Sequence, residues 1–257
     1  MRSLGRQGLL PTGEPAGRWA PTLGRSVRLF RDFGVEQTDP RRFYTALAED
    51  SVGQLSAYHD LAGATVLDVG GGPGYFRRAF ERAGASYVAL DADVGELSGA
   101  GDIAEWTVIG DGQRLPFRDD CVDVCYSSNV VEHVPDPWRM AEEMLRVTRP
   151  GGIAFISYTL WWGPWGGHET SPWHFLGGRY ARRRYLRKHG HEPKNKYGES
   201  LFGVTARAGL RWARQQQHGV VLAAVPRYHP WWARWVLRVP VLGEVLSWNL
   251  LLVVRKR

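Results

Sequence analysis

A short apolar strand pattern near the end of the first quarter of the chain runs directly into a turn rich in glycine. Residues 65–69 (TVLDV) are mostly β-branched or aliphatic, as in a strand buried on both faces of a parallel sheet. The turn GGGPG at 70–74 is then followed by apolar residues at helical spacing, namely Phe76, Ala79, Phe80 and Ala83. A strand, a glycine turn and a helix in this order predict the first βαβ unit of a nucleotide-binding sheet, because the backbone must bend sharply and approach its ligand closely.

The spacing inside this turn separates the kinds of nucleotide site. A dinucleotide fingerprint that begins at Gly70 needs glycine at position 75, where this chain has Tyr75. A phosphate-binding P-loop needs Gly-Lys followed by Ser or Thr, and no such sequence follows the turn. The chain instead has an acid followed by alternating glycines: Asp68, Gly70, Gly72 and Gly74. This pattern resembles motif I of the class I methyltransferases, which use S-adenosylmethionine; an ordinary glycine turn and a NAD site are the alternatives.

The resemblance implies an α/β fold with a doubly wound, mostly parallel seven-stranded sheet of Rossmann-like type. Its last strand is antiparallel, and a helical insertion precedes that strand. The resemblance covers about residues 40–160 through five ordered landmarks, of which the last is an Arg-Pro-Gly-Gly turn at 149–152 before an apolar strand at 153–158. The implied cofactor has a carboxylate that backbone N–H groups can meet and a ribose that needs an acidic acceptor.

Acidic residues follow the second and third predicted strands. Strand 86–90 ends at Asp91, about 20 residues past the turn, where a carboxylate can accept hydrogen bonds from both ribose hydroxyls, and Asp93 is the alternative. Strand 107–110 is followed by Asp111 and Gly112. In the resembled family an acid at this place accepts the adenine amine, with the backbone of the next residue nearby.

Two further cofactor contacts are implied by the resemblance. Asp39 and Pro40 begin a helical pattern and a second helix is predicted at 52–61, and helices of this kind cover the cofactor in the family. This makes Tyr44 a candidate contact, and the end of the fourth strand adds Asn129. The predicted cofactor-binding residues are therefore Asp68, Gly70, Gly72, Gly74, Asp91, Asp111, Gly112, Asn129 and Tyr44.

Histidines follow the fourth and fifth predicted strands, at the edge where the carboxyl ends of parallel strands converge. His133 comes after the fourth strand, and the segment HETSPWH at 168–174 comes after the fifth. Imidazole titrates near neutral pH and can remove the proton of an acceptor hydroxyl. The predicted catalytic residues are His133, His168, His174 and Glu169. A metal site made of the last three is an alternative, but its spacing matches no strong metal pattern, so no metal ligand is expected.

The domain organisation follows from length and local composition. A chain of 257 residues suits one α/β domain with additions. Residues 1–26 contain three prolines and five glycines with little apolar periodicity, which predicts a flexible N-terminal arm. Residues 27–257 are predicted to form a single methyltransferase domain. Its cofactor-binding core is expected at about 40–160, with acceptor-side or lid elements at about 161–200 and 228–247.

Aromatic and basic residues are concentrated in the C-terminal half. Eight of the twelve tryptophans lie in 161–175 and 231–248, and arginines crowd a predicted helix between these segments. Tryptophan clusters occur in cores, apolar ligand pockets and membrane interfaces. The insertion at 229–242 cannot span a bilayer because Arg234 and Arg238 interrupt it. It is either a lid that packs on the sheet or a helix that lies in a membrane interface.

Taken together, these patterns predict an enzyme that transfers a methyl group from S-adenosylmethionine to a small-molecule, lipid or glycan acceptor, at oxygen. An RNA methyltransferase, whose basic helix would follow the phosphate backbone, and a cofactor-binding module without catalysis are the alternatives. The sequence shows two cysteines and no signal-peptide or transmembrane pattern, which favours a cytoplasmic location. The alternative is a cytoplasmic protein that associates with the inner face of the membrane through its tryptophan- and arginine-rich segments.

Overall fold

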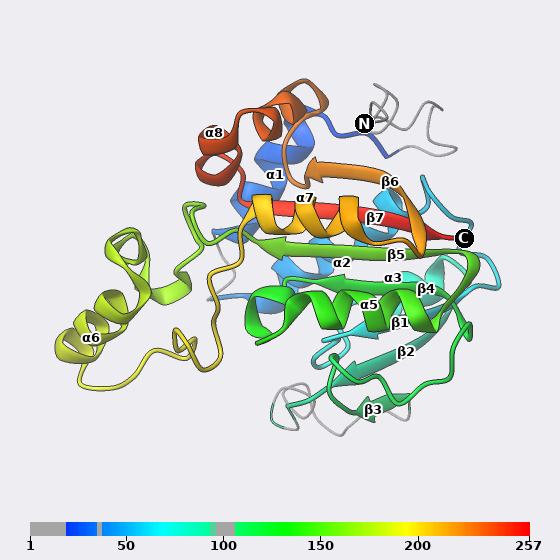
Figure 1. Ribbon diagram of the computed structural model, residues 1–257, viewed down its shortest axis with the longest axis horizontal. Helices are drawn as coiled ribbons and strands as arrows, with labels where there is room; N and C mark the ends of the chain where they lie inside the picture. The colour runs from blue at the N-terminus through cyan, green and yellow to red at the C-terminus, as the bar shows by residue number, and fades with distance from the viewer. Residues whose placement is uncertain (1–18, 35–37, 94, 96–105) are drawn as a thin grey trace.

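A seven-stranded sheet forms the centre of the computed structural model, which describes residues 19–34, 38–93, 95 and 106–257 (Figure 1). The strands are β1 (Thr65–Val69), β2 (Ser86–Asp91), β3 (Thr107–Ile109), β4 (Val122–Ser128), β5 (Thr148–Thr159), β6 (Gly219–Pro226) and β7 (Asn249–Lys256). Their order in the sheet is β3-β2-β1-β4-β5-β7-β6. Strands β1 to β5 pair in parallel, and β7 runs antiparallel between β5 and β6. The predicted doubly wound sheet is confirmed.

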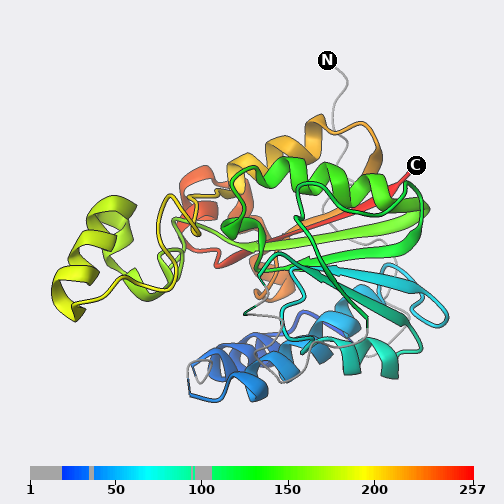
Figure 2. The ribbon, with the colours of Figure 1, turned by 90° about the horizontal axis from the view of Figure 1, so that it is seen from below.

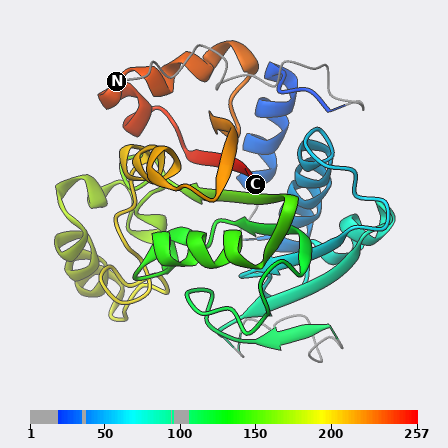
Figure 3. The same cartoon turned by 45° about the vertical axis from the view of Figure 1, so that its right-hand side comes forward.

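Helices cover both faces of this sheet, as Figures 2 and 3 show. One face carries α1 (Leu23–Phe33), α2 (Pro40–Leu55) and α3 (Arg77–Arg82), and the other carries α5 (Pro137–Val147) and α7 (Ala206–Gln215). Successive residues of a strand point to opposite faces, so Val66 joins the core under α2 and α3 while Leu67 joins the core under α5 and α7. Because β1 is buried on both faces of the sheet, its sequence is almost continuously apolar.

The remaining elements gather beyond the carboxyl ends of β4 and β5. The short turn η1 (Val131–His133) follows β4, and η2 (His168–Thr170) and η3 (Trp173–Leu176) follow β5. Helix α6 (Gly178–His189) then projects away from the sheet (Figures 1 and 2). Between β6 and β7 the chain forms η4 (Trp231–Arg238) and α8 (Pro240–Val245), which confirms the predicted helical insertion before the last strand.

The segment before the glycine turn differs from the prediction. Asp39 caps one continuous helix, α2, whose last residue is Leu55, so the separate helix predicted at 52–61 was wrong. Helix α1 begins at Leu23, inside the predicted arm at 1–26, and residues 1–18 of that arm lie outside the described residues. The buried Arg25 side chain explains this start, because its guanidinium makes a two-point ion pair with the carboxylate of Asp50 on α2.

Strand β5 begins earlier than predicted. Thr148 pairs with Val122 before the register shifts between Val122 and Val124, so the Arg-Pro-Gly-Gly segment at 149–152 is contained in the strand rather than forming a separate turn. Within the described part of the chain, no helix combines the length and the apolar character needed to cross a bilayer.

Candidate functional site

The glycine turn leaves β1 and folds back onto the end of β2. The backbone N–H groups of Gly70 and Gly71 donate to the carbonyl oxygen of Leu90 at 2.7 and 3.2 Å. Gly70 has φ +80°, and a Cβ at this position would overlap the side chain of Val130, which follows β4. Position 70 therefore has room only for glycine, and the turn is held between the ends of β2 and β4.

The outer part of the turn faces open space. Gly72 has φ +48°, and a Cβ added at Gly72 or at Gly74 would meet no protein atom within 4 Å. The N–H of Gly72 donates to Oδ2 of Asp91 at 3.0 Å, while Oδ1 of the same carboxylate accepts from the N–H of Asp93. The structure thus brings the half-buried Asp91 side chain to the turn, beside backbone that a ligand can approach.

Asp68 lies beneath the turn instead of on its open side. Its side chain is buried, and the Tyr87 hydroxyl donates to Oδ2 at 2.6 Å. Burial raises the pKa of Asp68 to about 7, the Tyr87 hydrogen bond opposes that rise, and the negative charge of Asp91 adds to it. A Cβ at Gly71 would lie 3.3 Å from Asp68 Cγ, so the backbone of the turn covers this carboxyl group. Asp68 supports the turn from below.

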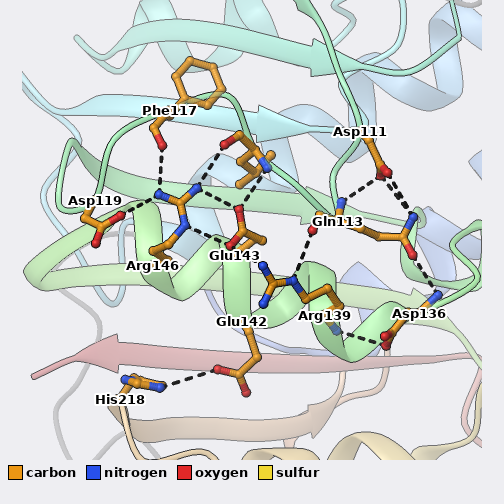
Figure 4. A network of polar contacts seen from close by, with 11 residues as sticks. Asp111, Gln113, Phe117, Asp119, Asp136, Arg139, Glu142, Glu143, Arg146 and His218 are labelled. Carbon is orange, nitrogen blue, oxygen red and sulfur yellow. Dashed lines mark hydrogen bonds and ion pairs between the residues drawn. The ribbon is translucent and has the colours of Figure 1, made fainter.

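Asp111 and Gly112 begin the loop that follows β3. The exposed Asp111 carboxylate accepts hydrogen bonds from the backbone N–H and the side-chain amide of Gln113, at 2.8 and 3.1 Å (Figure 4). A Cβ at Gly112 would lie 3.1 Å from Cγ1 of Val69. The backbone of this loop therefore packs against the end of β1, while the Asp111 side chain is turned toward Gln113.

Two charged residues of α5 fix the same loop (Figure 4). Glu143 accepts from the N–H of Leu115 at 3.0 Å, and Arg146 donates to the carbonyl oxygens of Leu115 and Phe117 at 3.0 and 2.9 Å. The hydrogen bond from Arg146 lowers the pKa of Glu143, so the pair stays ionised around neutral pH. Sequence reasoning missed this support, because Glu143 and Arg146 look like any two of the four charged residues of α5, and their spacing does not show that they contact a distant loop.

The two other predicted cofactor contacts come from α2 and from the residue after β4. The Tyr44 ring stacks on the ring of Tyr75, the residue directly after the turn, with centroids 5.0 Å apart and planes within 3°. Asn129 has φ +58° and its side-chain oxygen accepts from the Asn249 amide at 2.6 Å. Tyr44 is thus beside the turn, whereas the Asn129 side chain is directed toward the start of β7.

His133 and His168 meet beyond the ends of β4 and β5. Their ring centroids are 5.1 Å apart. Nδ1 of His133 lies 2.7 Å from the carbonyl oxygen of Ser200, and because a carbonyl only accepts, the neutral tautomer has its proton on Nδ1 and its lone pair on Nε2. Burial, followed by the charges of His133, His174 and Lys194, lowers the pKa of His168 to about 3, so this imidazole is neutral near pH 7.

The other two predicted catalytic residues are more enclosed. His174 is fully buried, with Nε2 3.2 Å from the carbonyl oxygen of Gly163 and its ring against Phe175. Burial lowers the pKa of His174. Oε1 of Glu169 accepts from the Asn195 amide at 2.9 Å, while Oε2 is buried without a hydrogen-bond partner among the described residues.

Glu132 completes this cluster, and sequence reasoning did not single it out. Its side chain is 1% exposed, and Oε1 accepts from the N–H of Thr159 at the end of β5, at 3.0 Å. The possible ligand atoms of Glu132, His133 and His168 all lie within 4.8 Å of one another. The structure therefore groups His168 with these two residues instead of with Glu169 and His174. The sequence signal that could have pointed to Glu132 was an acid next to a histidine in a short turn after a buried strand.

Comparisons with known proteins decide the family. Residues 67–156, from β1 into β5, match the family model of a methyltransferase domain. An uncharacterized methyltransferase of Mycolicibacterium vanbaalenii is 54% identical over 244 residues, covering 91% of this chain and 95% of the relative. One of Mycobacterium marinum is 52% identical over 246 residues, covering 92% of this chain and 96% of the relative. The chain belongs to the class I S-adenosylmethionine-dependent methyltransferases.

Solved structures show the same fold for this methyltransferase. An S-adenosylmethionine-dependent methyltransferase from Mesorhizobium loti superposes with a TM-score of 0.51 at 22% identity, over 81% of this chain and 98% of that one. A chain of the Haloferax volcanii complex between a methyltransferase and the Trm112 activator has a TM-score of 0.50 at 21% identity, over 90% of this chain and 94% of that one. The methyltransferase is thus an enzyme of a known class, with the doubly wound, mostly parallel seven-stranded sheet that its sequence predicted.

Proposed function

We propose that this methyltransferase binds S-adenosylmethionine along the outer side of the glycine turn and transfers the methyl group to an acceptor oxygen near His133. The observation that carries the proposal is the contact between Gly72 and Asp91, because it puts a carboxylate beside accessible backbone at the carboxyl end of the sheet. The chain's residues fit the cofactor. The space beside Gly72 and Gly74 is open, and Tyr75, whose ring stacks on that of Tyr44, comes directly after the turn. When bound, the cofactor supplies a methyl group activated by a positively charged sulfur.

The cofactor roles follow the chemistry of each group. The backbone of the turn, which is open beside Gly72 and Gly74, lies against the methionine part of the cofactor, and Asp91 accepts hydrogen bonds from the ribose hydroxyls. The loop at Asp111 and Gly112 receives the adenine end, and the Tyr44–Tyr75 stack covers the ligand. Asp68 acts through the turn that it supports, while Asn129 orders the segment after β4.

On the acceptor side, His133 and His168 differ in their ability to act as a base. The Nε2 lone pair of His133 can take the proton of an acceptor hydroxyl. With a pKa of about 3, His168 is a weak base near pH 7, so its neutral ring orients the acceptor rather than removing the proton. Glu169 and His174 hold η2 and η3 in place behind them. The protein thus aligns the two reactants and excludes water.

Incubation with methyl-labelled S-adenosylmethionine tests this proposal. Calorimetry first measures binding of the cofactor, and the protein is then mixed with fractionated small-molecule, lipid, glycan and RNA extracts. We expect cofactor binding and label in a small-molecule, lipid or glycan fraction, released as a methyl ether or ester. Label in RNA would favour the RNA alternative, and binding without any transfer would favour a cofactor-binding module.

A second feature favours an acceptor that lies in a lipid surface. In η4, Ala233 and Val236 pack inward, whereas Trp231, Trp232 and Trp235 are 63, 54 and 49% exposed. Further exposed apolar residues come from α8 and from the neighbouring helix α1, among them Val241, Val245, Leu23 and Val27. One side of this segment is buried against the domain, and the other offers tryptophans of the kind found at membrane interfaces.

A further inference from the structure

Three side chains with metal-ligating atoms converge where β4 and β5 end. Glu132 and His133 belong to η1, and His168 belongs to η2, 35 positions further along the chain. Their candidate ligand atoms are mutually within 4.8 Å. Three atoms no more than 4.8 Å apart share a central point that is at most about 2.8 Å from each of them. Zinc bonds to histidine nitrogen and carboxylate oxygen are about 2.0–2.2 Å long, so each ligand would move by less than about 1 Å.

Unpaired buried atoms make this convergence more than a chance cluster. Oε2 of Glu132 and Nε2 of His168 are both buried, and neither has a hydrogen-bond partner among the described residues. The Glu132 side chain is 1% exposed. A buried carboxylate oxygen or imidazole nitrogen without a partner is costly to a fold, which indicates that another group satisfies these atoms.

The surrounding hydrogen bonds already orient the ligands. Ser200 accepts from Nδ1–H of His133, which leaves the Nε2 lone pair available. Backbone carbonyls play this role beside metal-binding histidines, where they fix the tautomer and the ring orientation. The N–H of Thr159 likewise holds Oε1 of Glu132, while Oε2 of the same carboxylate has no partner among the described residues.

We propose that Glu132, His133 and His168 bind one divalent transition-metal ion. Two imidazoles and one carboxylate form a donor set used by catalytic zinc and by non-haem iron(II), with further coordination positions left for other ligands. A hydroxyl or carboxylate oxygen of the methyl acceptor is the class of ligand that such a position takes. In the metal-bound chain the ion, instead of the Nε2 lone pair of His133, would activate that oxygen. This last step rests on the proposed function, whereas metal binding by the three side chains does not.

Metal titration of the full chain tests the site. The protein is stripped with a chelator and dialysed, and Co²⁺ is then added while its visible absorption is recorded. Zn²⁺ affinity is measured by competition with a chromophoric chelator, and the bound metal is counted by mass spectrometry. We expect one equivalent of metal, and at least a tenfold weaker affinity in both Glu132→Gln and His168→Gln. Glutamine at 132 keeps an oxygen for the Thr159 N–H, which limits damage to the fold.

The matched control is His191→Gln. Nδ1 of His191 also lies against a backbone carbonyl, that of Glu192 at 2.9 Å, but this exposed residue is not part of the cluster. The control should bind metal like the unmodified chain, and circular dichroism should show that all variants are folded. Binding of Co²⁺ and Zn²⁺ at well below one equivalent, or equal affinity in the unmodified chain and both cluster variants, would overturn the proposal.

Calorimetry with S-adenosylmethionine on the same proteins separates this proposal from the proposed function. The contacts of the cluster side chains described above are with Thr159, Ser200 and one another, not with residues 70–74, so both cluster variants should bind the cofactor normally. A chain that binds the cofactor but no metal disproves only the metal site. A chain that binds metal but not the cofactor disproves only the cofactor site.

Discussion

The carboxylate of Asp91 accepts a hydrogen bond from the backbone N–H of Gly72 across 3.0 Å, joining the end of β2 to the turn after β1. Because the two strands are parallel neighbours, their carboxyl ends meet at one edge of the sheet. Asp91, the acid proposed to bind the ribose, therefore also fixes the conformation of the turn that is proposed to bind the rest of the cofactor. A change at either residue should affect both.

Replacing Asp91 by alanine should weaken S-adenosylmethionine binding by about 10- to 100-fold, because each hydrogen bond to a charged group contributes roughly 1.5–3 kcal/mol. Calorimetry measures the change, and Asp93→Ala is the matched control from the same loop. Normal affinity in Asp91→Ala combined with a loss in Asp93→Ala would assign the ribose contact to Asp93.

Gly70→Ala should destabilise the fold by roughly 1–3 kcal/mol, since its new methyl group overlaps the Val130 side chain at a position with positive φ. The double variant Gly70→Ala with Val130→Ala should recover part of this loss, as urea denaturation would show. Gly72→Ala is the comparison, because its methyl group would meet no protein atom. A Gly70→Ala protein as stable as the original would contradict the packing described for the turn.

Asp68 should make stability fall as pH rises from about 4 to about 7. Its folded-state pKa of about 7 lies above the value near 4 of an unfolded chain, so in this window the folded chain keeps a proton that the unfolded chain has lost. Asp68→Asn imitates the protonated acid and still accepts from Tyr87. The stability of the original protein relative to this variant should drop by roughly 4 kcal/mol over the window and stay constant above it.

Denaturation at several pH values measures this difference. The exposed Asp60 provides the control, because Asp60→Asn should give a pH profile parallel to that of the original protein. Parallel profiles for Asp68→Asn and the original protein would show that the buried carboxyl group does not titrate in this range.

The sheet could be predicted because its signals are local. The apolar run of β1, the glycine turn and the acid at Asp91 each lie within a few residues, and period and spacing reveal them. What the sequence could not reveal depends on contacts between distant segments. The start of α1 depends on Arg25 reaching Asp50, and the burial of Asp68 depends on Tyr87 covering it.

The acceptor side shows the same limit. Sequence reasoning named His133 and His168 from their places after two strands, and the structure brings them together. It also named His174, whose ring is enclosed by neighbouring aromatic residues. It overlooked Glu132, which is of interest because one of its carboxylate oxygens is buried without a hydrogen-bond partner among the described residues. Spacing along the chain does not tell which side chains of two separate loops will face each other.

The double variant Trp231→Ser with Trp232→Ser should bind anionic vesicles less well than the original protein. These side chains are more than half exposed, and tryptophans near arginines favour the interface of an anionic bilayer. Flotation with vesicles of phosphatidylcholine and phosphatidylglycerol measures binding. Trp106→Ser is a matched control because Trp106 is 56% exposed at the far edge of the sheet beside β3. Equal flotation of all three proteins would contradict a membrane-facing role.

Arg227 provides a stability prediction that no sequence pattern suggested. Its guanidinium is fully buried and donates to the hydroxyls of Ser128, Ser157 and Ser51 at 2.7, 2.5 and 2.6 Å. These serines belong to β4, β5 and α2, so one side chain joins three elements behind the candidate site. Its own carbonyl oxygen accepts from Arg25, which ties α1 to the same point.

Arg227→Lys should therefore lower the free energy of unfolding by roughly 2–4 kcal/mol, because an ammonium group cannot reach all three hydroxyls and remains a buried charge. Urea denaturation measures the loss. The control is Arg255→Lys on β7, where the side chain is exposed and donates to the Tyr58 carbonyl, and where a change within about 0.5 kcal/mol is expected. Equal losses at the two positions would show that the planar fork of Arg227 contributes nothing beyond its charge.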